Sequence, residues 1–378
     1  MSSMVKSCHE FPLAGAVGIQ WELPKMGGDE SFRRNIAPSI SIIVPVHNGG
    51  GKFRRCLLSI LAARPEPEEI IVVADGDTDG SGAMAEDMGI KVISTGPSPL
   101  GPAGARNAGA EAATEQILFF VDADVEIHGD CVSLIREFFR ENPDVAAVIG
   151  SYDDAPFETN FLSQFKNLFH CYTHQTARIE ASTFWGACGA IRRGIFFGVD
   201  GFDQRFARPS IEDIELGYRL IKSGYRIRLL KNLQVKHLKQ WRFRMLLKSD
   251  IFDRALPWTR LIHQQGKILS DLNLKIADRI SCAVVFGLIL TLPFVFINNW
   301  VWMVTGFFFT VILISNRNLY LYLLRLRGGV FALKSILFHQ FYLFYSGLSF
   351  MFGKMTWYFK KCSPIDHAPV IDTRRGNP

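Results

Sequence analysis

Residues 69–86 read EIIVVADGDTDGSGAMAE, an apolar run that ends in a turn rich in aspartate and glycine. From Asp75 to Glu86 the turn fits the pattern of a calcium-binding loop, D-x-[DN]-x-[DN]-G-x5-E, at every specified position. Such a loop needs a helix on each side. The run before Asp75 is short, apolar and β-branched, which predicts a buried strand instead. We therefore favour a strand followed by an acidic turn over a calcium site, with Asp79 as N-cap of the next helix.

Short apolar runs and amphipathic helical stretches alternate on both sides of this turn. Strands are predicted at residues 40–45, 69–74, 91–93 and 116–121, and helices at residues 52–63, 80–88 and 103–114. This alternation predicts an α/β domain with a Rossmann-like, mostly parallel sheet that is covered by helices on both faces. In such sheets ligands bind outside the carboxyl ends of the strands, so the residues that follow each strand are the candidate binding residues.

Polar side chains follow three of these strands. His47 and Asn48 follow the first, Asp75 the second, and Asp122 and Asp124 the fourth. No G-x-G-x-x-G follows the first strand and no G-x-x-x-x-G-K-[ST] is present, so the glycine-cradled modes of nucleotide binding lack their signatures. A divalent cation bridging the Asp-x-Asp pair to a diphosphate is the remaining economical arrangement, because Mg²⁺ takes one or two carboxylates together with phosphates. A lone Asp-x-Asp is also common in ordinary turns.

Five motifs resemble those of family 2 glycosyltransferases with the GT-A fold, in the same order and spacing. They are SIIVPVHN (41–48), VVADGDTDGS (72–81), GARNAG (104–109), FFVDAD (119–124) and IEDIELGYRL (211–220). The resemblance covers residues 39–240 of the chain. It implies a GT-A catalytic domain that moves a sugar from a nucleotide-sugar donor by inversion, with Mn²⁺ or Mg²⁺ as cofactor.

The resemblance also assigns residues to the donor site. Pro45, His47 and Asn48 are expected to line the nucleotide pocket. Asp75 is expected to accept a hydrogen bond from the base, as the second aspartate of the family's usual Asp-Asp-Gly-Ser, whereas Ala74 stands in place of the first. The resemblance further implies that Arg106 contacts the base or the diphosphate and that Asp122 contacts the ribose or the metal. Asp124 and His237 are expected to bind the metal. His237 would otherwise be a surface residue or a phosphate contact.

Glu212 and Asp213 match the family's Glu-Asp pair, which contains the catalytic base. Displacement at an anomeric carbon needs a carboxylate within reach of the acceptor hydroxyl. We therefore assign the base to Asp213, with Glu212 orienting it. Acidic residues in the first turn of a helix also simply favour its dipole. Trp185 and Gly186 lie in a small-residue stretch that is expected to flank the sugars on the acceptor side, although close packing would account for it equally well.

Trp258 is the last candidate on the acceptor side. The Gln-x-x-Arg-Trp motif of processive polysaccharide synthases is not intact, and its nearest counterpart is residues 253–258. Trp258 either stacks on an acceptor sugar or anchors an interfacial helix, where tryptophan is enriched. We favour the anchor and a non-processive transferase.

The apolar residues of the chain are concentrated near its C-terminal end. Hydrophobic residues make up 48% of the 378 residues although 21% are charged, and residues 280–315 and 335–353 contain no Asp, Glu, Lys or Arg. Because about 20 residues cross a bilayer, the sequence predicts membrane helices at residues 280–297, 299–315 and 335–353. The third is either a span or a re-entrant segment, and a buried soluble hairpin is the alternative for the first two.

Charge and cysteine content limit the partners and the compartment. The net charge of +6 is concentrated near the apolar segments, at residues 236–244 and in a predicted loop at 317–334. This distribution favours contact with anionic lipid over nucleic acid. The seven cysteines are scattered and form no C-x-x-C pair, which fits a reducing compartment. With no evident secretory signal, we expect an inner- or plasma-membrane protein with a cytoplasmic catalytic domain.

The sequence thus predicts five segments: an N-terminal tail (1–38), a GT-A domain (39–247), an amphipathic linker (248–279), a membrane region (280–358) and a C-terminal tail (359–378). The predicted function is a membrane-anchored glycosyltransferase that acts on a lipid-linked or envelope glycan acceptor. The alternatives are a catalytically silent nucleotide-binding membrane scaffold and, less favoured, a calcium-binding module.

Overall fold

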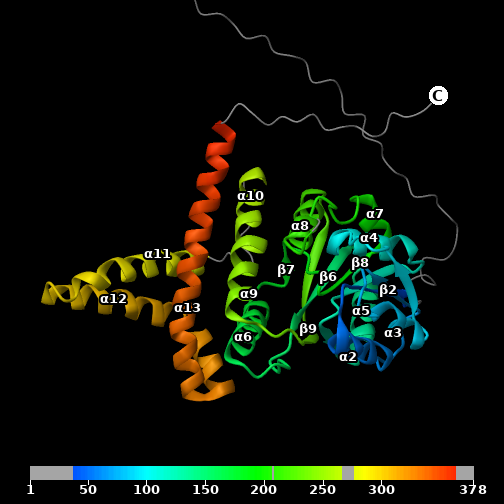
Figure 1. The fold of residues 1–378 in the computed structure, drawn as a ribbon, viewed down its shortest axis with the longest axis horizontal. Helices are drawn as coiled ribbons and strands as arrows, with labels where there is room; N and C mark the ends of the chain where they lie inside the picture. Colours follow the sequence, from blue (N-terminus) through cyan, green and yellow to red (C-terminus); the bar gives the residue numbers. More distant parts are fainter. Residues whose placement is uncertain (1–36, 207, 266–275, 363–378) are drawn as a thin grey trace, which may run out of the picture. The chain divides into compact units, whose positions relative to one another are not determined.

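The computed structural model describes residues 37–206, 208–265 and 276–362 (Figure 1). Nearly all of the two predicted tails lies outside these residues. Within them the chain forms an α/β domain with one mixed sheet, followed by a C-terminal helical region. The α/β architecture predicted from the alternating pattern is confirmed.

The sheet contains nine strands among the described residues, in the order β3-β2-β1-β4-β8-β6-β9-β5, with β7 paired to β9. The strands β3, β2, β1 and β4 are parallel, and β8 runs antiparallel between β4 and β6. The strands are β1 (Ile40–Val46), β2 (Glu69–Ala74), β3 (Lys91–Ser94), β4 (Ile117–Val121), β5 (Val125–Ile127), β6 (Val145–Tyr152), β7 (Glu180–Ala181), β8 (Cys188–Arg192) and β9 (Arg226–His237).

Helices accompany the strands in the α/β domain. They are α2 (Gly50–Leu61), α3 (Ser81–Asp87), α4 (Gly101–Ala112), α5 (Cys131–Glu141), α6 (Phe161–Gln175), α7 (Arg193–Gly198) and α8 (Glu212–Lys222). Every residue of β4 is buried, which is why its sequence, ILFFV, is continuously apolar. Phe120 of β4 packs against Phe184, Phe196 and Phe202 from three later segments of the chain. This aromatic cluster joins the parallel half of the sheet to the later segments that precede α8.

The helix α8 lies unusually close to the segment before β8. A Cβ atom at Gly217 would stand 2.3 Å from the backbone nitrogen of Phe184 and 2.5 Å from the Cα of Thr183. Only glycine allows this approach, and the approach sets the position of the first turn of α8, which carries Glu212 and Asp213.

The C-terminal helical region differs from its predicted boundaries. It consists of α9 (Phe243–Lys248), the π-helix η1 (Ser249–Ala255), α10 (Leu256–Gln265), α11 (Ile276–Thr291), the 3-10 turn η3 (Leu292–Phe294), α12 (Asn299–Ser315) and α13 (Arg317–Cys362). The first apolar helix ends at Thr291 and not at residue 297, because Pro293 follows and cannot donate a helical hydrogen bond. The second predicted helix coincides with α12.

The predicted loop at residues 317–334 is wrong, because these residues form the first part of α13. Leu319 and Leu323 are buried there and pack with Phe165 and Leu168 of α6, so a helical face replaces the expected loop. Within α13, the backbone departs from helical geometry at Gly328, which has φ 81° and marks a kink between two helical parts. The third predicted helix, residues 335–353, is therefore part of a longer one.

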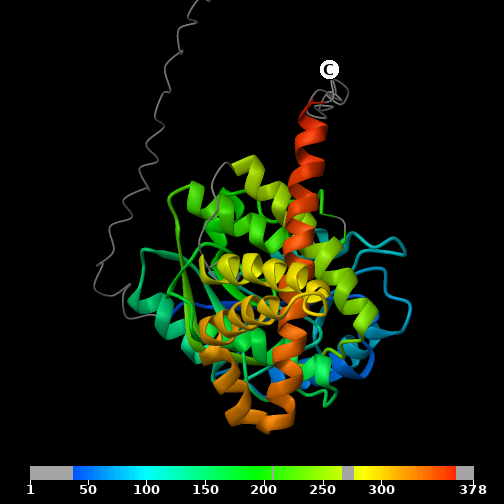
Figure 2. The ribbon, with the colours of Figure 1, turned by 90° about the vertical axis from the view of Figure 1, so that its left-hand side faces the viewer.

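The helices α11 and α12 lie side by side (Figures 1 and 2). Many of their apolar side chains are exposed. Phe296 is 88% exposed and Ile297 is 76% exposed at the turn between them. Among the described residues, no single helix combines the length and the apolar composition of a membrane span, whereas α12 and residues Arg317–Phe359 of α13 do so as a pair bent by 68°.

We expect Gly217→Ala to lower the stability of the α/β domain by roughly 1–3 kcal/mol, because the new methyl group meets backbone atoms that have no room to move. The melting temperature of purified protein would fall by about 2–4 °C per kcal/mol. Gly194→Ala in α7 is the matched control, since no atom lies within 4 Å of its Cβ position. Equal melting temperatures of the two variants would contradict the close approach of α8.

Candidate functional site

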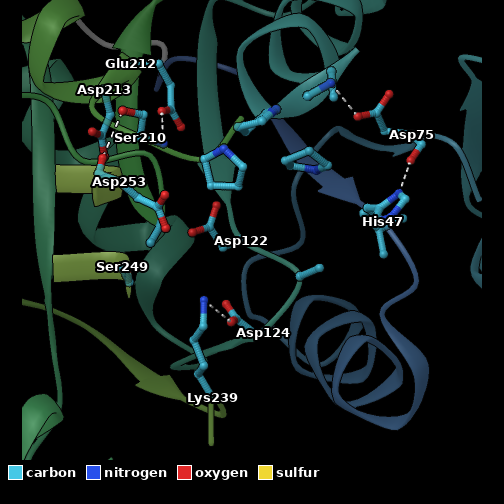
Figure 3. Close-up of a pocket in the computed structure, with 18 of the residues that line it drawn as sticks. His47, Asp75, Asp122, Asp124, Ser210, Glu212, Asp213, Lys239, Ser249 and Asp253 are labelled. Carbon is cyan, nitrogen blue, oxygen red and sulfur yellow. Dashed lines mark hydrogen bonds and ion pairs between the residues drawn. The ribbon is translucent and has the colours of Figure 1, made fainter. Parts of the chain in front are cut away.

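A cavity of about 700 Å³ opens at the carboxyl ends of β1, β2 and β4 (Figure 3). Predicted site residues that line it are Pro45, His47, Asn48, Asp75, Arg106, Asp122, Asp124, Trp185, Glu212 and Asp213. Three predicted residues do not line it: Gly186, whose N–H donates to Asp213, His237, whose Nε2 lies 3.9 Å from Asp124 Oδ2, and Trp258. The structure thus brings ten predicted residues between Pro45 and Asp213 together in one cavity, at the carboxyl ends of the strands where an α/β sheet binds its ligands.

The acidic turn after β2 mainly organises the backbone around it. The Asp75 carboxylate is buried and accepts hydrogen bonds from the Thr95 hydroxyl at 2.8 Å and from the N–H groups of Leu100 and Gly101 at 2.7 and 2.9 Å. It therefore holds the N-terminus of α4. The Nδ1 atom of His47 lies 2.6 Å from the backbone oxygen of Asp75 and joins the ends of β1 and β2.

The prediction that Asp79 is the N-cap of the helix after the acidic turn is wrong by one residue. The N-cap of α3 is Gly80, in a left-handed conformation, while the Asp79 carboxylate accepts a hydrogen bond from the Ser81 N–H at 3.0 Å. Glu86, the last residue of the calcium-loop pattern, is exposed on α3. No group of three His, Cys, Asp or Glu side chains suited to a metal occurs in the described part of the chain. The pattern match is explained by turn geometry.

Arg106 joins the two halves of the cavity. Its guanidinium donates to Asp122 Oδ1 at 2.7 Å and to Glu212 Oε1 at 2.9 Å, and its side chain is only 5% exposed. Burial opposes the charged form, but the carboxylates of Asp122 and Glu212 hold the pKa of Arg106 above its ordinary value. A Cβ atom at Gly186 would lie 2.8 Å from the guanidinium carbon, so Gly186 makes room for this arginine.

Asp213 carries the most strongly perturbed carboxyl group in the cavity. Burial, followed by the neighbouring charge of Glu212, raises its pKa to about 6, although Arg106 and Arg254 oppose that rise. One carboxylate oxygen accepts a hydrogen bond from the Gly186 N–H at 3.2 Å. A carboxylate with this pKa accepts protons far more readily near neutral pH than an ordinary aspartate does.

Asp122 and Asp124 present partly exposed carboxylates to the cavity, with side chains 33% and 31% exposed. Asp124 Oδ2 lies 3.8 Å from Lys239 Nζ and 3.9 Å from His237 Nε2. Burial lowers the pKa of His237 to about 3, so its imidazole is neutral, as a metal ligand must be. These donors fit an ion shared with phosphate oxygens, because Mg²⁺ or Mn²⁺ then needs only one or two carboxylates from the protein. They do not form a complete protein-only site.

The cavity also includes residues that sequence reasoning missed. Ser249, Asp253 and Arg254 of η1 line it, and so do Lys239 and Trp241. The charge pattern predicts that the basic cluster at 236–244 contacts lipid, whereas in the structure Lys239 of this cluster faces Asp124. The indole N–H of Trp241 is buried and has no hydrogen-bond partner among the described residues. A π-helix often marks a functional site, and η1 includes the start of residues 253–258, the nearest counterpart of the processive-synthase motif.

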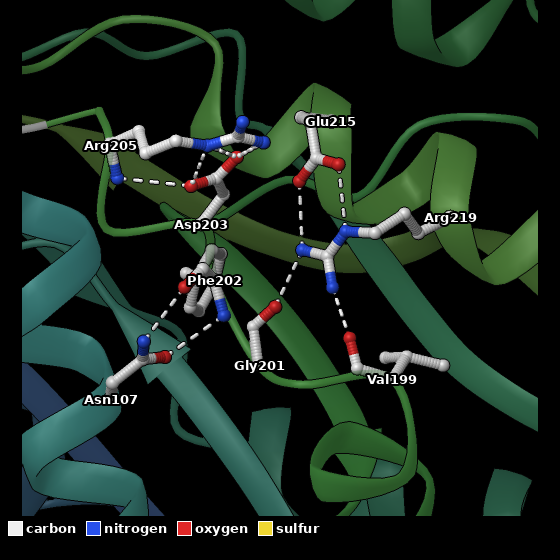
Figure 4. A network of polar contacts seen from close by, with 8 residues as sticks. All are labelled: Asn107, Val199, Gly201, Phe202, Asp203, Arg205, Glu215 and Arg219. Carbon is white, nitrogen blue, oxygen red and sulfur yellow. Dashed lines mark hydrogen bonds and ion pairs between the residues drawn. The ribbon is translucent and has the colours of Figure 1, made fainter. Parts of the chain in front are cut away.

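A polar network holds the loop after α7 between α4 and α8 (Figure 4). Asn107 of α4 donates to the Phe202 carbonyl at 2.8 Å and accepts from the Phe202 N–H at 2.9 Å. Arg219 of α8 pairs with Glu215 and also donates to the carbonyl groups of Val199 and Gly201. The network fixes α8, and with it Asp213, relative to the sheet.

Trp258 lies away from the large cavity. Its indole N–H donates to the Tyr218 hydroxyl at 3.0 Å, and the side chain lines a second, smaller cavity that also reaches Asp213. Trp185 lines both cavities.

Residues 41–197 match the family model described as "Glycosyl transferase family 2". Over this range, which is less than half of the chain, the α/β domain is similar to the glycosyltransferases of family 2. The chain is 33% identical to the uncharacterized glycosyltransferase YibD of Escherichia coli (strain K12) over an aligned stretch of 99 residues. This stretch makes up 25% of this chain and 28% of that protein. It is 22% identical to the O-antigen chain rhamnosyltransferase WbaN of Salmonella anatum over 241 residues. This alignment covers 58% of this chain and 74% of that protein.

One solved structure establishes the fold of the chain. The mannosyltransferase PcManGT from Pyrobaculum calidifontis, solved in complex with GDP-Man and Mn²⁺, aligns with a TM-score of 0.52 at 14% identity. The alignment covers 87% of this chain and 89% of that one. The predicted GT-A architecture, a mixed α/β domain followed by a helical region, is thereby confirmed.

We expect Arg106→Met to lower the free energy of unfolding by roughly 3–5 kcal/mol, because it leaves the buried Glu212 carboxylate without its cation. Arg205→Met is the matched control: the Arg205 side chain is 90% exposed, and its loss should change stability by no more than about 0.5 kcal/mol. Urea unfolding followed by circular dichroism measures both. A small effect at Arg106 would contradict a buried ion bridge.

Proposed function

We propose that this chain transfers a sugar from a nucleotide-sugar donor to a hydroxyl group of a glycan or lipid-linked acceptor, with inversion at the anomeric carbon. One observation carries the proposal. Asp213, with a pKa of about 6, borders the same cavity as the paired carboxylates of Asp122 and Asp124. A proton acceptor and a place for a metal-bound diphosphate are the two requirements of such a transfer.

The donor fits the side of the cavity formed by β1, β2 and α4. His47 and Asn48 border this side, and Asp75 orders the N-terminus of α4 beside it. Trp241 lines the same cavity. The named similar proteins include a rhamnosyltransferase and a mannosyltransferase solved in complex with GDP-Man, which supports a nucleoside diphosphate sugar as donor without fixing the base or the sugar.

Different residues of the chain have different roles in the proposed reaction. Asp213 accepts the proton of the acceptor hydroxyl while that oxygen forms the new bond to the anomeric carbon. The bond from this carbon to the diphosphate oxygen breaks, and the nucleoside diphosphate leaves with the bonding electrons. Asp124, with Asp122 and the neutral His237 beside it, would hold Mn²⁺ or Mg²⁺, which offsets the negative charge of the leaving group when bound. Arg106 keeps Glu212 in place behind Asp213.

The exposed apolar helices support membrane anchoring. The α11 and α12 hairpin has no charged residue from 280 to 315 and exposes Phe296, Ile297 and Met303 to more than 70%. Each helix is about 25 Å long at 1.5 Å per residue, so the pair is short for a bilayer core of about 30 Å. We propose that this hairpin enters the lipid, with the catalytic domain on the cytoplasmic side. A catalytically silent scaffold would bind nucleotide at the same cavity without turning it over.

Asp213→Asn should reduce kcat by roughly 10²–10⁴-fold, because an amide cannot accept the proton of the acceptor. The wild-type rate should also depend on pH. Since the raised pKa of about 6 belongs to the folded enzyme, Asp213 is mostly protonated below that pH, and kcat/KM should fall about tenfold per pH unit there and level off above it. Nucleoside diphosphate release measures both.

Asp200→Asn is the matched control for Asp213→Asn. Asp200 is exposed and has φ 63°, a conformation that asparagine also accepts. Its activity should stay within about twofold of wild type. Full activity of the Asp213→Asn enzyme would rule out Asp213 as the base.

The double variant Phe296→Asp, Ile297→Asp should release a large share of the protein from membranes in alkaline carbonate, because charges in the apolar core are costly, at about 3 kcal/mol each. Leu58→Asp, Leu61→Asp on α2 introduces the same charges on the α/β domain and should leave membrane attachment unchanged. Complete extraction of the wild-type chain by carbonate would contradict insertion of the hairpin.

A further inference from the structure

The helix α13 exposes an apolar face along most of its length after the kink at Gly328. Six large apolar side chains of this face recur at helical spacing: Leu333, Leu337, Phe341, Leu348, Phe352 and Met355. Positions separated by three, four or seven residues fall on one side of a helix. These side chains are between 38% and 62% exposed within the described part of the chain. We call these six residues the α13 stripe.

The other side of α13 packs along the helices that border the α/β domain. Three contacts mark its path: Phe338 to Phe165 of α6, Tyr345 to Asp250 of η1, and Trp357 to His263 of α10. The ring centroids lie 5.1 Å apart in the first contact and 5.0 Å apart in the third, and the Tyr345 hydroxyl donates at 2.7 Å. Residues 338–357 extend over about 28 Å of helix.

This packing decides how α13 can lie relative to a bilayer. A length of about 28 Å is nearly the whole thickness of the hydrocarbon core, about 30 Å. If α13 crossed the bilayer, it would carry α6 and η1 into the lipid. The helix α6 belongs to the α/β domain, and η1 contributes Asp253 and Arg254 to the large cavity. Charged groups are costly in the apolar core, so an orientation along the membrane surface is the compatible one.

The hairpin of α11 and α12 shows on which side of α13 the lipid lies. Phe344 falls on the same face as the α13 stripe, between Phe341 and Leu348, and its ring centroid lies 5.3 Å from that of Phe286 in α11. The hairpin therefore leaves α13 from the striped face. The axes of α12 and α13 are bent by 68°, so the hairpin stands steeply on α13 (Figure 1). A hairpin that enters the lipid thus brings the stripe to the membrane surface.

The border of the stripe is basic. The 46 residues of α13 include no Asp or Glu but seven Lys or Arg. Beside the stripe, Phe243 of α9 stacks on Phe341 at 5.9 Å and is flanked by the exposed Arg242 and Arg244. An apolar face bordered by cations is typical of helices that lie in the interface of anionic membranes. A second copy of the chain on this face would bring no Asp or Glu of α13 to pair with these cations.

We propose that α13 lies flat on an anionic membrane surface, with the α13 stripe at the boundary between headgroups and acyl chains. The α11 and α12 hairpin enters the bilayer steeply from the same face. Residues 335–353 are then a surface segment and not a third span, and both ends of α13 stay on the side of the α/β domain. The inference goes beyond the proposed hairpin insertion and does not depend on sugar transfer.

The depth of spin labels in the membrane distinguishes a surface helix from a span. Leu337→Cys and Phe352→Cys each place a label on the stripe of the full chain, in vesicles of phosphatidylcholine and phosphatidylglycerol. Exposure to oxygen and to a water-soluble nickel complex added outside gives the depth. Both labels should lie about 5–10 Å inside the headgroup boundary. In a spanning helix their depths would differ by about 22 Å, at 1.5 Å per residue.

Two further labels serve as references, and the unsubstituted chain corrects for its own seven cysteines. Phe296→Cys in the hairpin should be shielded from the nickel complex, and Leu58→Cys on α2 should be fully exposed to it. Depths at 337 and 352 that differ by 20 Å or more, or strong dipolar broadening between two chains, would overturn the proposal. A shielded Phe296→Cys with both stripe labels in water would retain the hairpin anchor and reject the surface helix.

Vesicle binding tests the lipid contact of α13 without the hairpin. In the Phe296→Asp, Ile297→Asp chain, the stripe should still bind vesicles, about tenfold more weakly when phosphatidylglycerol is left out. Adding Leu337→Asp, Phe352→Asp should weaken binding at least about tenfold, because two large apolar side chains no longer enter the boundary. Adding Leu58→Asp, Leu61→Asp instead is the matched control and should change nothing. Equal binding of all these chains, with or without anionic lipid, would contradict a surface helix.

Discussion

The buried guanidinium of Arg106 is the interaction on which the site depends. It lies between Asp122 at the end of β4 and Glu212 at the start of α8, two carboxylates 90 residues apart in the chain by their numbering. A buried arginine is tolerated only when its charge is matched, so the end of the sheet and the start of α8 must come together for the domain to fold. The absence of a side chain at Gly186 leaves the space for it.

The contact between Arg106 and Glu212 also affects the pKa of the neighbouring Asp213. Glu212 is fixed beside Asp213 by its bond to Arg106, and its negative charge adds to burial in raising the pKa of Asp213 to about 6. The approach of Gly217 to the backbone at Thr183 and the network around Arg219 hold α8 against the sheet. A carboxyl group with a pKa near 6 is thus a consequence of packing around α8 as well as of the Glu-Asp pair itself.

The sequence predicted those parts of the structure that local patterns determine. Polar residues follow the apolar strands, as Asp122 and Asp124 follow β4, and this pattern indicated where the cavity lies. The carboxyl ends of parallel strands meet at one edge of the sheet, so residues that follow them come together there. It did not predict that Asp75 would bind the N-terminus of α4, nor that Lys239 and Arg254 would enter the cavity. Those contacts join segments separated by long stretches of chain, and charge alone suggested lipid for Lys239. The sequence did not predict the helical start of α13, because the arginines of this stretch indicated a charged loop although its leucines are buried against α6.

Turnover of a nucleotide sugar tests most directly whether the large cavity is a donor site. The full chain in nanodiscs would be incubated with Mn²⁺ and UDP-, GDP- or dTDP-linked sugars, and nucleoside diphosphate release would be followed for the wild type and for Asp124→Asn. We predict slow release from at least one donor, dependent on Mn²⁺ or Mg²⁺ and strongly reduced in the variant, because Asp124 presents its carboxylate to this cavity. Release by Asp124→Asn at the wild-type rate, or no binding or release of any donor by the wild type, would contradict a donor site there.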